Sequence, residues 1–251
     1  MIGQKSGIDK ARADIGVVCA LPIELGSFLT RCQRTNHYKD RFVFRGGIYD
    51  DIRIAVVESG LGYARARQAT LSLIETHAPK WILSCGFSGA LQSTMQLGHI
   101  AVASSIVDQH GQELTLPRHF PAAPERGLFI GRLLTVDTMV RTVAEKESLA
   151  EQYNAIAVDM ESLAVVQVAH EKQLDCMAIR TISDDMSVDL PPEILSILGE
   201  TGTVRIGATL GSLVKRPGSL KDMMHLRQNA QTAAQSLATF LDGIVHQLPQ
   251  A

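Results

Sequence analysis

The stretch from Ala155 to Ala169 joins the end of a strand to a helix that is apolar on almost every face. Ala155–Val158 is a short apolar run, and two acids, Asp159 and Glu161, follow it directly. A helix without a polar face has to be buried, so this segment needs a core around it. The order of strand, acids and buried helix predicts an α/β fold in which a rigid element carries a carboxylate to the edge of the core. Acids at a helix N-terminus also interact favourably with the helix dipole, so a purely structural role for them is an open alternative.

The composition is that of an ordinary globular protein, with 45% hydrophobic and 20% charged residues. A length of 251 residues suits one large α/β domain or two small ones. No repeat or linker divides the chain. We therefore predict a mobile leader at residues 1–13 and a single domain over residues 14–251, with a helical extension at its C-terminus. No apolar run approaches the ~18 residues that a membrane-spanning helix needs.

Charge and cysteine content argue against several kinds of partner. The net charge of −2 is spread over interspersed acids and bases, so nucleic acid is not an expected partner. The four cysteines form no CxxC pair, and no His/Cys cluster has metal-ligand spacing, so we predict no metal site. Cysteines in apolar contexts and the lack of a signal peptide favour a reduced protein in the cytoplasm.

Short continuous apolar runs are typical of strands that are buried on both faces. The first run, Ile15–Ala20, is followed by Pro22, which suits the first turn of a helix, and by Glu24 in that turn. Further strands are predicted at Arg41–Tyr49, Asp51–Glu58, Trp81–Cys85, Gly98–Val107, Leu128–Val136 and Cys176–Ile182. Helices are predicted over residues 63–76, from Asp137 onward and in the amphipathic C-terminal segment, and residues 110–126 are predicted to form a loop.

Three acids from distant parts of the chain, Glu24, Glu161 and Asp184, each follow an apolar strand. The carboxyl ends of parallel strands meet at one edge of a sheet, where ligands bind, so we expect these carboxylates to converge. Convergent carboxylates favour glycosidic-bond chemistry. An oxocarbenium-like transition state needs nearby anions, a base for water and an acid for the leaving group. The structural alternatives are a turn role for Asp184 and an ion-pair role for Arg180.

Five segments carry a resemblance to a known superfamily. They are Ile15–Glu24, Ser59–Gly62, Cys85–Ala90, Ala157–Glu161 and Arg180–Asp184. Together they resemble the nucleoside phosphorylase and nucleosidase superfamily, and they are most similar to the 5'-methylthioadenosine/S-adenosylhomocysteine nucleosidases, over residues 15–185. The resemblance implies a single-domain, three-layer α/β/α fold with a mixed central sheet. It also implies a small-molecule nucleoside substrate, no cofactor and a homodimer.

The resemblance assigns the catalytic roles residue by residue. Glu24 would be the base that polarises a water toward the anomeric carbon. Asp184 would hold N7 and the exocyclic amine of adenine and donate the proton that the departing base needs. Arg180 and Ser183 would support the water and Asp184. Asp184 can act as an acid only if burial or a like charge raises its pKa.

The same resemblance implies the substrate-binding residues. Glu161 would bind the ribose hydroxyls, and Met160 would pack on the sugar. Met139 would lie on the face of the base, and the backbone of Val140 would bind its edge. These assignments place one acid and an apolar wall around the nucleoside.

The glycine-containing segment Cys85–Ala90, the second of two such segments after Ser59–Gly62, departs from the superfamily pattern. We place Gly86 and Phe87 in the substrate-binding site. Phosphorylases of the superfamily bind phosphate with an Arg and a Ser, and the corresponding positions here are Ser84 and Phe87. The acid Glu24 near this point would repel phosphate, which favours hydrolysis over phosphorolysis. Nucleosidases carry a Ser where Phe87 stands, beside the attacking water.

The substrate's 5' group is expected to differ from that of methylthioadenosine. The segment between Val107 and Leu128 is shorter than in the methylthioadenosine enzymes. The C-terminal segment Pro191–Lys221 is additional, and it resembles a hopanoid-associated branch whose substrate is an adenosyl-lipid. The expected base is adenine, and a large apolar 5' substituent is one alternative.

Three functions therefore stay open at the level of sequence. The first is a nucleosidase that releases adenine from a 5'-substituted adenosine. The second is a phosphorylase on the same scaffold, with an obligatory requirement for phosphate. The third is a non-catalytic nucleoside-binding protein, and Phe87 is the residue that keeps this alternative open.

Overall fold

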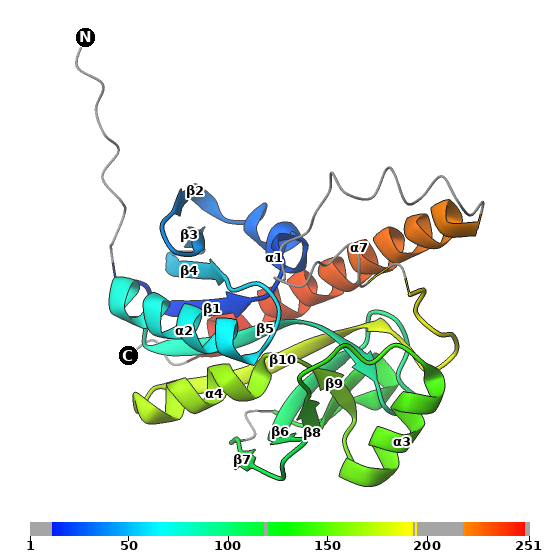
Figure 1. Ribbon diagram of the computed structural model, residues 1–251. Coiled ribbons are helices and arrows are strands. Elements are labelled where there is room, and N and C mark those ends of the chain that lie inside the picture. Colours follow the sequence, from blue (N-terminus) through cyan, green and yellow to red (C-terminus); the bar gives the residue numbers. More distant parts are fainter. Residues whose placement is uncertain (1–11, 118–119, 193, 195–217, 249–251) are drawn as a thin grey trace.

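A mixed sheet of ten strands forms the centre of the part of the chain that the structure describes (Figure 1). The computed structural model describes residues 12–117, 120–192, 194 and 218–248. The strands are β1 (Ile15–Cys19), β2 (Gln33–Lys39), β3 (Val43–Tyr49), β4 (Ile52–Glu58), β5 (Trp81–Ala90), β6 (Ile100–Asp108), β7 (Glu113–Thr115), β8 (Leu128–Thr135), β9 (Ala157–Asp159) and β10 (Asp175–Asp184). The helices are α1 (Pro22–Leu29), α2 (Tyr63–His77), α3 (Val143–Tyr153), α4 (Ser162–Glu171) and α7 (Gly218–Ile244), with 3-10 turns at Pro124–Arg126 and Val245–Gln247.

Four parallel strands set the edge at which the site lies. Strand β1 pairs in parallel with β4 on one side and with β5 on the other, and β5 pairs in parallel with β10. All five residues of β1 are buried, as expected for a strand covered on both faces. The carboxyl ends of these strands therefore come together at one edge of the sheet.

Beyond β5 the sheet curls back on itself. Strand β10 pairs with both β5 and β6, and the order continues through β8 and β9 back to β5. Five strands thus close a ring. This closure brings the end of β9, which carries Asp159, against the end of β5.

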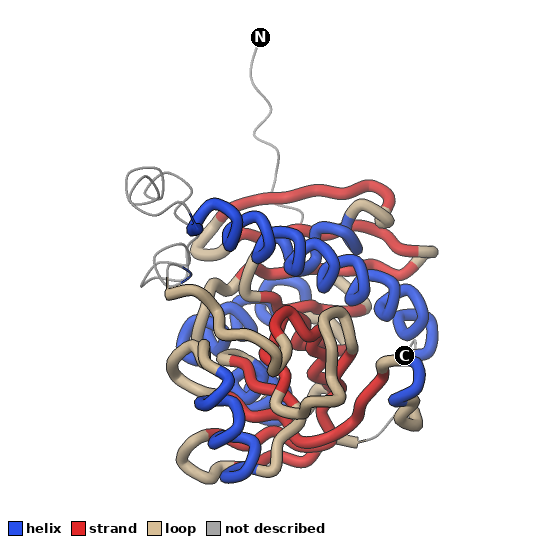
Figure 2. The backbone as a smooth tube through the Cα atoms, turned by 90° about the vertical axis from the view of Figure 1, so that its right-hand side faces the viewer, coloured by secondary structure: helices blue, strands red, loops and turns tan. Residues whose placement is uncertain are grey.

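Helices cover the sheet on both faces, as the two views show (Figures 1 and 2). Leu73 of α2 and Leu163 of α4 lie in one large apolar cluster. Phe28 of α1 and Leu237 of α7 lie in a second cluster on the other side. A third, smaller cluster packs against Leu149 of α3. The predicted three-layer α/β/α architecture with a mixed central sheet is confirmed.

The strand predicted to end at Cys85 is longer than expected. Strand β5 continues past Cys85 to Ala90, and β10 likewise continues past Ile182 to Asp184. The two strands stay paired from Gly86 to Gly89, so each segment satisfies the backbone groups of the other. The residues of the second glycine segment are therefore held in a sheet and not in a flexible turn.

Helix α3 begins at Val143, and the prediction of a helix start at Asp137 is wrong. Thr142 is its N-cap, because the Thr142 hydroxyl accepts a hydrogen bond from the Glu145 backbone while Glu145 caps the Thr142 backbone in return. Met139 and Val140 therefore lie in the irregular segment between β8 and α3.

Two strands were not predicted. Strand β2 is almost wholly exposed and polar, so it lacks the alternation of apolar residues that indicates a strand. Strand β7 is only three residues long and lies in the segment that was predicted to be a loop. Strand β2 pairs with β3 and β7 pairs with β6, and Tyr38 of β2 also stacks on Phe44 of β3.

The ends of the chain are described in part. Residues 1–11, most of the predicted leader, and residues 195–217, most of the predicted C-terminal extension, lie outside the described residues. Ala13, at the end of the predicted leader, is buried and donates a backbone hydrogen bond to the carbonyl of His77. None of the described helices is long and apolar enough to cross a membrane.

Candidate active site

Glu24 lies in the first turn of α1, where three backbone N–H groups hold its carboxylate. The N-cap residue, Leu21, has no side chain that could cap the helix, and Glu24 reaches back to the backbone N–H of Leu21 itself. Its Oε2 accepts hydrogen bonds from Ala20 N at 2.7 Å and from Leu21 N at 2.8 Å, and its Oε1 accepts one from Phe87 N at 3.0 Å. Glu24 is only 4% exposed. Burial raises the pKa of Glu24, and the backbone donors Leu21 and Phe87 oppose that rise.

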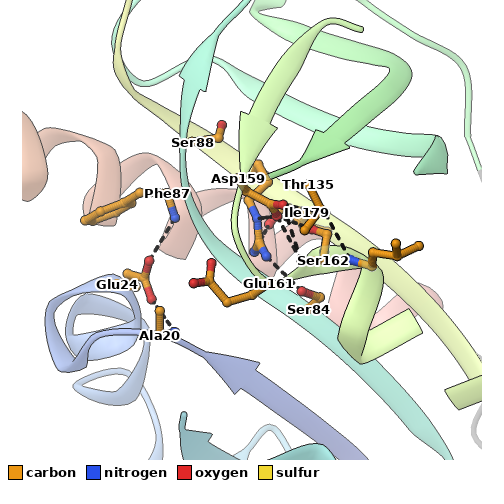
Figure 3. Close-up of polar contacts among 12 residues, drawn as sticks. Ala20, Glu24, Ser84, Phe87, Ser88, Thr135, Asp159, Glu161, Ser162 and Ile179 are labelled. Atoms are coloured by element: carbon orange, nitrogen blue, oxygen red, sulfur yellow. Dashed lines mark hydrogen bonds and ion pairs between the residues drawn. The ribbon is translucent and has the colours of Figure 1, made fainter. Parts of the chain in front are cut away.

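Phe87 reaches Glu24 through its main chain and not through its ring. Successive side chains of a strand point to opposite faces, so the ring lies on the face of β5 opposite to that of Gly86. A Cβ atom added at Gly86 would lie 2.8 Å from Glu24 Oε1 and 3.1 Å from Arg180 Nη1. Figure 3 shows the ring extending away from Glu161. The bulk of Phe87 is thus directed away from the point where Glu24 and Arg180 approach the strand.

Glu161 links the N-termini of two helices. It is the N-cap of α4 and is 8% exposed, and its Oε1 accepts a hydrogen bond from Gly62 N at 2.7 Å. Gly62 is the N-cap of α2 and has φ of 95°, a conformation that glycine adopts without strain. Burial, followed by the charge of Asp159, raises the pKa of Glu161 to about 8. The carboxyl groups of Glu24 and Glu161 face one another in Figure 3.

Arg180 and Asp159 form a buried ion pair beside these two acids. Their side chains are 2% and 1% exposed, and Arg180 Nε donates to Asp159 Oδ2. Arg180 Nη2 also donates to Ser84 Oγ at 2.9 Å. Asp159 accepts further hydrogen bonds from the Thr135 hydroxyl and from the backbone and hydroxyl of Ser162. The guanidinium is therefore fixed in place, with Nη1 directed toward Gly86.

Asp184 lies at the end of β10, next to Gly89. Its Oδ2 is 2.6 Å from Lys146 Nζ, and its Oδ1 accepts a hydrogen bond from the Ser183 hydroxyl at 2.8 Å. Burial raises the pKa of Asp184, and the charge of Lys146 opposes that rise. The expected support of Asp184 by Ser183 is thus present. Arg180 lies apart from this pair, because its described hydrogen bonds go to Asp159, Ser84 and the Ile179 carbonyl.

The two proposed catalytic acids stand at different points along β5. Glu24 lies beside Gly86 and Asp184 beside Gly89. Three residues of a strand span about 10 Å. The structure brings Glu24, Glu161 and Arg180 into one cluster and places Asp184 in a second one further along the strand.

Apolar side chains adjoin the acids. Val140 and Met160 both pack against the third apolar cluster, which also contains Val158 of β9. Met139 precedes Val140 in the same segment and is half-buried. Val140 and Met160 thus pack on the same apolar cluster as Val158 of β9 and Leu149 of α3.

Two charged residues with a structural part in the site were missed as site residues. From the sequence, Asp159 has only the alternative of a helix-dipole role at the start of α4. Lys146 lies near the N-terminus of α3, where the helix dipole disfavours a cation. That unfavourable position is the one signal that could have marked it. Among the described residues, no group of three or more His, Cys, Asp or Glu side chains could hold a metal ion.

Comparison with known proteins assigns the family. The sequence profile of the phosphorylase superfamily matches residues 14–129 and 122–196. The chain belongs to the phosphorylase superfamily. The superfamily resemblance expected from the five sequence segments is confirmed, and the matched residues contain every acid of the two clusters.

Relatives within the phosphorylase superfamily cover most of the chain. The 5'-methylthioadenosine/S-adenosylhomocysteine nucleosidase of Shewanella loihica is 25% identical over 214 residues, which are 75% of this chain and 93% of the relative. The crystal structure of the corresponding nucleosidase from Helicobacter pylori matches with a TM-score of 0.70 at 19% identity, over 94% of this chain and 99% of that chain. The futalosine hydrolase of Helicobacter pylori matches with a TM-score of 0.68 at 19% identity, over 93% and 97%. The structural matches show a shared fold.

Proposed function

We propose that this phosphorylase-superfamily protein is a nucleosidase that hydrolyses the N-glycosidic bond of a 5'-substituted adenosine and releases adenine. The names of its relatives support this reaction class. The observation that carries the proposal is the charge of the cluster at Gly86. Glu24, Glu161 and Asp159 surround one guanidinium, that of Arg180, which is already paired with Asp159.

This charge balance favours water over phosphate as the nucleophile. A phosphate dianion next to Glu24 would meet a carboxylate in a buried setting, where screening is weak, and the nearby guanidinium of Arg180 is already paired with Asp159. At Ser84, where the resemblance places the anion-binding Arg of a phosphorylase, the hydroxyl accepts a hydrogen bond from Arg180. A neutral water needs no cation there, and a carboxylate can orient it.

The proposed reaction transfers one proton at each end of the substrate. Glu24 takes a proton from water as the water oxygen bonds to the anomeric carbon. The C–N bond to the base breaks, its electron pair moves onto the purine, and Asp184 gives a proton to N7. Glu161 binds the ribose hydroxyls, and anionic groups nearby stabilise the positive charge of the sugar in the transition state.

The apolar wall supports a substrate with a purine and an apolar 5' group. Met139 and Met160 are flexible thioethers that adapt to flat or irregular apolar surfaces. Methylthioadenosine, S-adenosylhomocysteine and an adenosyl-lipid share the adenine that Asp184 and Val140 would bind. The proposal therefore specifies the base and leaves the 5' group to a substrate panel.

We further propose that the protein acts as a homodimer in the cytoplasm. The superfamily resemblance supports the dimer, and the four free, buried cysteines are consistent with a reducing compartment. Sedimentation at micromolar concentration tests the dimer, and a monomer at every concentration would contradict it.

The experiment is adenine release from methylthioadenosine, S-adenosylhomocysteine, 5'-deoxyadenosine and adenosine, compared between the wild type and two variants. Glu24→Gln and Asp184→Asn should each lower kcat by about 10²- to 10⁴-fold, the usual range for losing a general base or acid. Circular dichroism and thermal unfolding should show that both variants fold. Normal turnover by either variant would contradict its assigned role, and tight nucleoside binding without turnover by the wild type would favour a binding protein.

A further inference from the structure

Lys146 is a buried lysine whose ammonium contacts the proposed catalytic acid directly. The side chain of Lys146 is 0% exposed, and that of Asp184 is 13% exposed. Nζ lies 2.6 Å from Asp184 Oδ2, 2.7 Å from the Asp185 carbonyl oxygen and 3.3 Å from the Asp184 carbonyl oxygen. An ammonium has three N–H donors, and here each has an acceptor. Lys146 therefore keeps no free donor for a substrate and can act on the reaction only through Asp184.

The ammonium also fixes the backbone that carries Asp184. The register between β10 and β5 shifts between Ile182 and Asp184. Such an irregularity adds a residue to one strand and redirects the next side chain. Lys146 binds the two carbonyl groups that follow this irregularity. The Lys146 side chain of α3 thus holds both the Asp184 carboxyl group and the backbone segment that sets the direction of this carboxyl group.

The charge of the Lys146 ammonium also affects the protonation of Asp184. Buried lysine is rare unless it is paired, because taking the ammonium out of water is costly. Two charged groups flank the Asp184 carboxyl: Lys146, which favours its ionised form, and the neighbouring Asp185, which disfavours it. On the other sides stand Gly89 of β5 and Val158 of β9, and Asp159, the acid of β9, is paired with Arg180.

We propose that Lys146 is a positioning residue for glycosidic-bond cleavage, which orients the Asp184 carboxyl and stabilises the negative charge that this group acquires when it gives up its proton. This inference rests on the proposed function. Because Oδ2 faces an ammonium that can only donate, the acid proton of Asp184 is placed on Oδ1. When that proton passes to the purine N7, the carboxylate that remains is paired with Lys146. No proton leaves Lys146 in this step.

The proposal predicts a specific change in pH dependence. Asp184 must be protonated to act, so activity is lost as pH rises through its pKa. Lys146 lowers that pKa, so removing its charge lets burial raise the pKa further. In Lys146→Met the alkaline limb of the kcat profile should move to higher pH. Its kcat at the optimum should also fall at least about tenfold, because the acid is weaker and its anion unpaired. KM should change little, since Lys146 does not touch the substrate.

The experiment measures kcat and KM for adenine release against pH in wild type, Lys146→Met, Lys146→Arg and Lys172→Met. Lys146→Arg keeps the charge and should keep the wild-type position of the alkaline limb, even if its larger head group lowers stability. Lys172→Met is a matched control, because it removes the same charge from an exposed position. It should leave the whole profile unchanged.

Several results would overturn the inference. An unmoved alkaline limb in Lys146→Met, with only kcat or stability reduced, would give Lys146 a purely structural role. If the alkaline limb moves as far in Lys172→Met as in Lys146→Met, the shift would come from the change in net charge and not from the contact with Asp184. If Lys146→Met does not fold, a shifted limb in Lys146→Arg decides against the inference, and an unshifted one supports it. Absence of adenine release by the wild type would instead contradict the proposed function itself.

Discussion

The backbone N–H of Phe87 donates a hydrogen bond of 3.0 Å to Glu24 Oε1, while the ring of Phe87 lies on the opposite face of β5 from Gly86. A large aromatic residue can therefore stand beside the proposed water site without filling it. This arrangement removes the main reason for regarding the protein as a binding module that has lost its water.

Replacing the Phe87 ring should leave the reaction nearly intact. Phe87→Ser and Phe87→Ala both keep the N–H that holds Glu24, so kcat/KM should change by less than about tenfold, or 1.4 kcal/mol. Stability should fall by about 1–2 kcal/mol, because a half-buried ring is lost. Steady-state kinetics and thermal unfolding measure the two effects. A loss of activity of a hundredfold or more would mean that the ring shapes the site.

Adding one methyl group at Gly86 should have the opposite effect. The Cβ of Gly86→Ala would lie 2.8 Å from Glu24 Oε1, and three backbone donors, one on Oε1 and two on Oε2, hold this carboxylate in place. Displacing a catalytic group by about 1 Å costs about a hundredfold in rate, so kcat should fall by that factor.

Gly26→Ala is the control for this substitution, because it lies in the same helix as Glu24 and a Cβ there meets nothing within 4 Å. It should keep full activity and gain about 0.5–1 kcal/mol of stability, since alanine favours a helix. Equal activities of Gly86→Ala and Gly26→Ala would contradict the placement of Glu24.

The ion pair of Asp159 with Arg180 should be a major determinant of stability. Asp159→Asn leaves a buried guanidinium without its carboxylate, and breaking such a pair costs about 3–5 kcal/mol. The melting temperature should fall by roughly 10 °C for a chain of this size. Glu171→Gln removes one partner of the exposed Arg67–Glu171 pair and should cost less than about 1 kcal/mol. Similar losses in the two variants would show that Asp159 is not the main partner of Arg180.

Stability should decrease as the solution becomes alkaline. Burial raises the pKa of Glu161 to about 8, above its ordinary value of 4.5. A raised carboxyl pKa means that the fold favours the protonated form, so this contribution is complete below the unfolded pKa and is lost as pH rises through about 8. Glu161→Gln cannot ionise and should flatten the decline. Melting temperatures of both proteins between pH 6 and 9 test this, and parallel curves would argue against it.

The sequence features that predicted the fold and the site are local ones. Ile15–Ala20 is apolar throughout, so it had to be a buried strand, and Glu24 follows it closely enough that its position at the sheet edge was predictable. The same reasoning placed Glu161 and Asp184 after their strands. The positions of these acids at the ends of their strands could therefore be predicted from the sequence, because they depend only on neighbours along the chain.

Features that depend on distant partners were not predictable in the same way. The exposed, polar strand β2 exists only because it pairs with β3, and β5 continues through its glycines only because β10 lies beside them. The contact between Lys146 and Asp184 joins residues 38 apart in sequence. Neither residue's neighbours along the chain indicate that contact, and the closure of the strand ring produces it.

The most direct test of the central claim is the dependence of adenine release on phosphate, together with the identity of the sugar product. We expect the rate in phosphate-free buffer to equal the rate at saturating phosphate, and phosphorus NMR to detect no sugar phosphate. Adenine release that requires phosphate and yields a sugar 1-phosphate would contradict it. That result would mean that the cluster of Glu24, Glu161 and Arg180 accepts an anion after all, and that the protein is a phosphorylase.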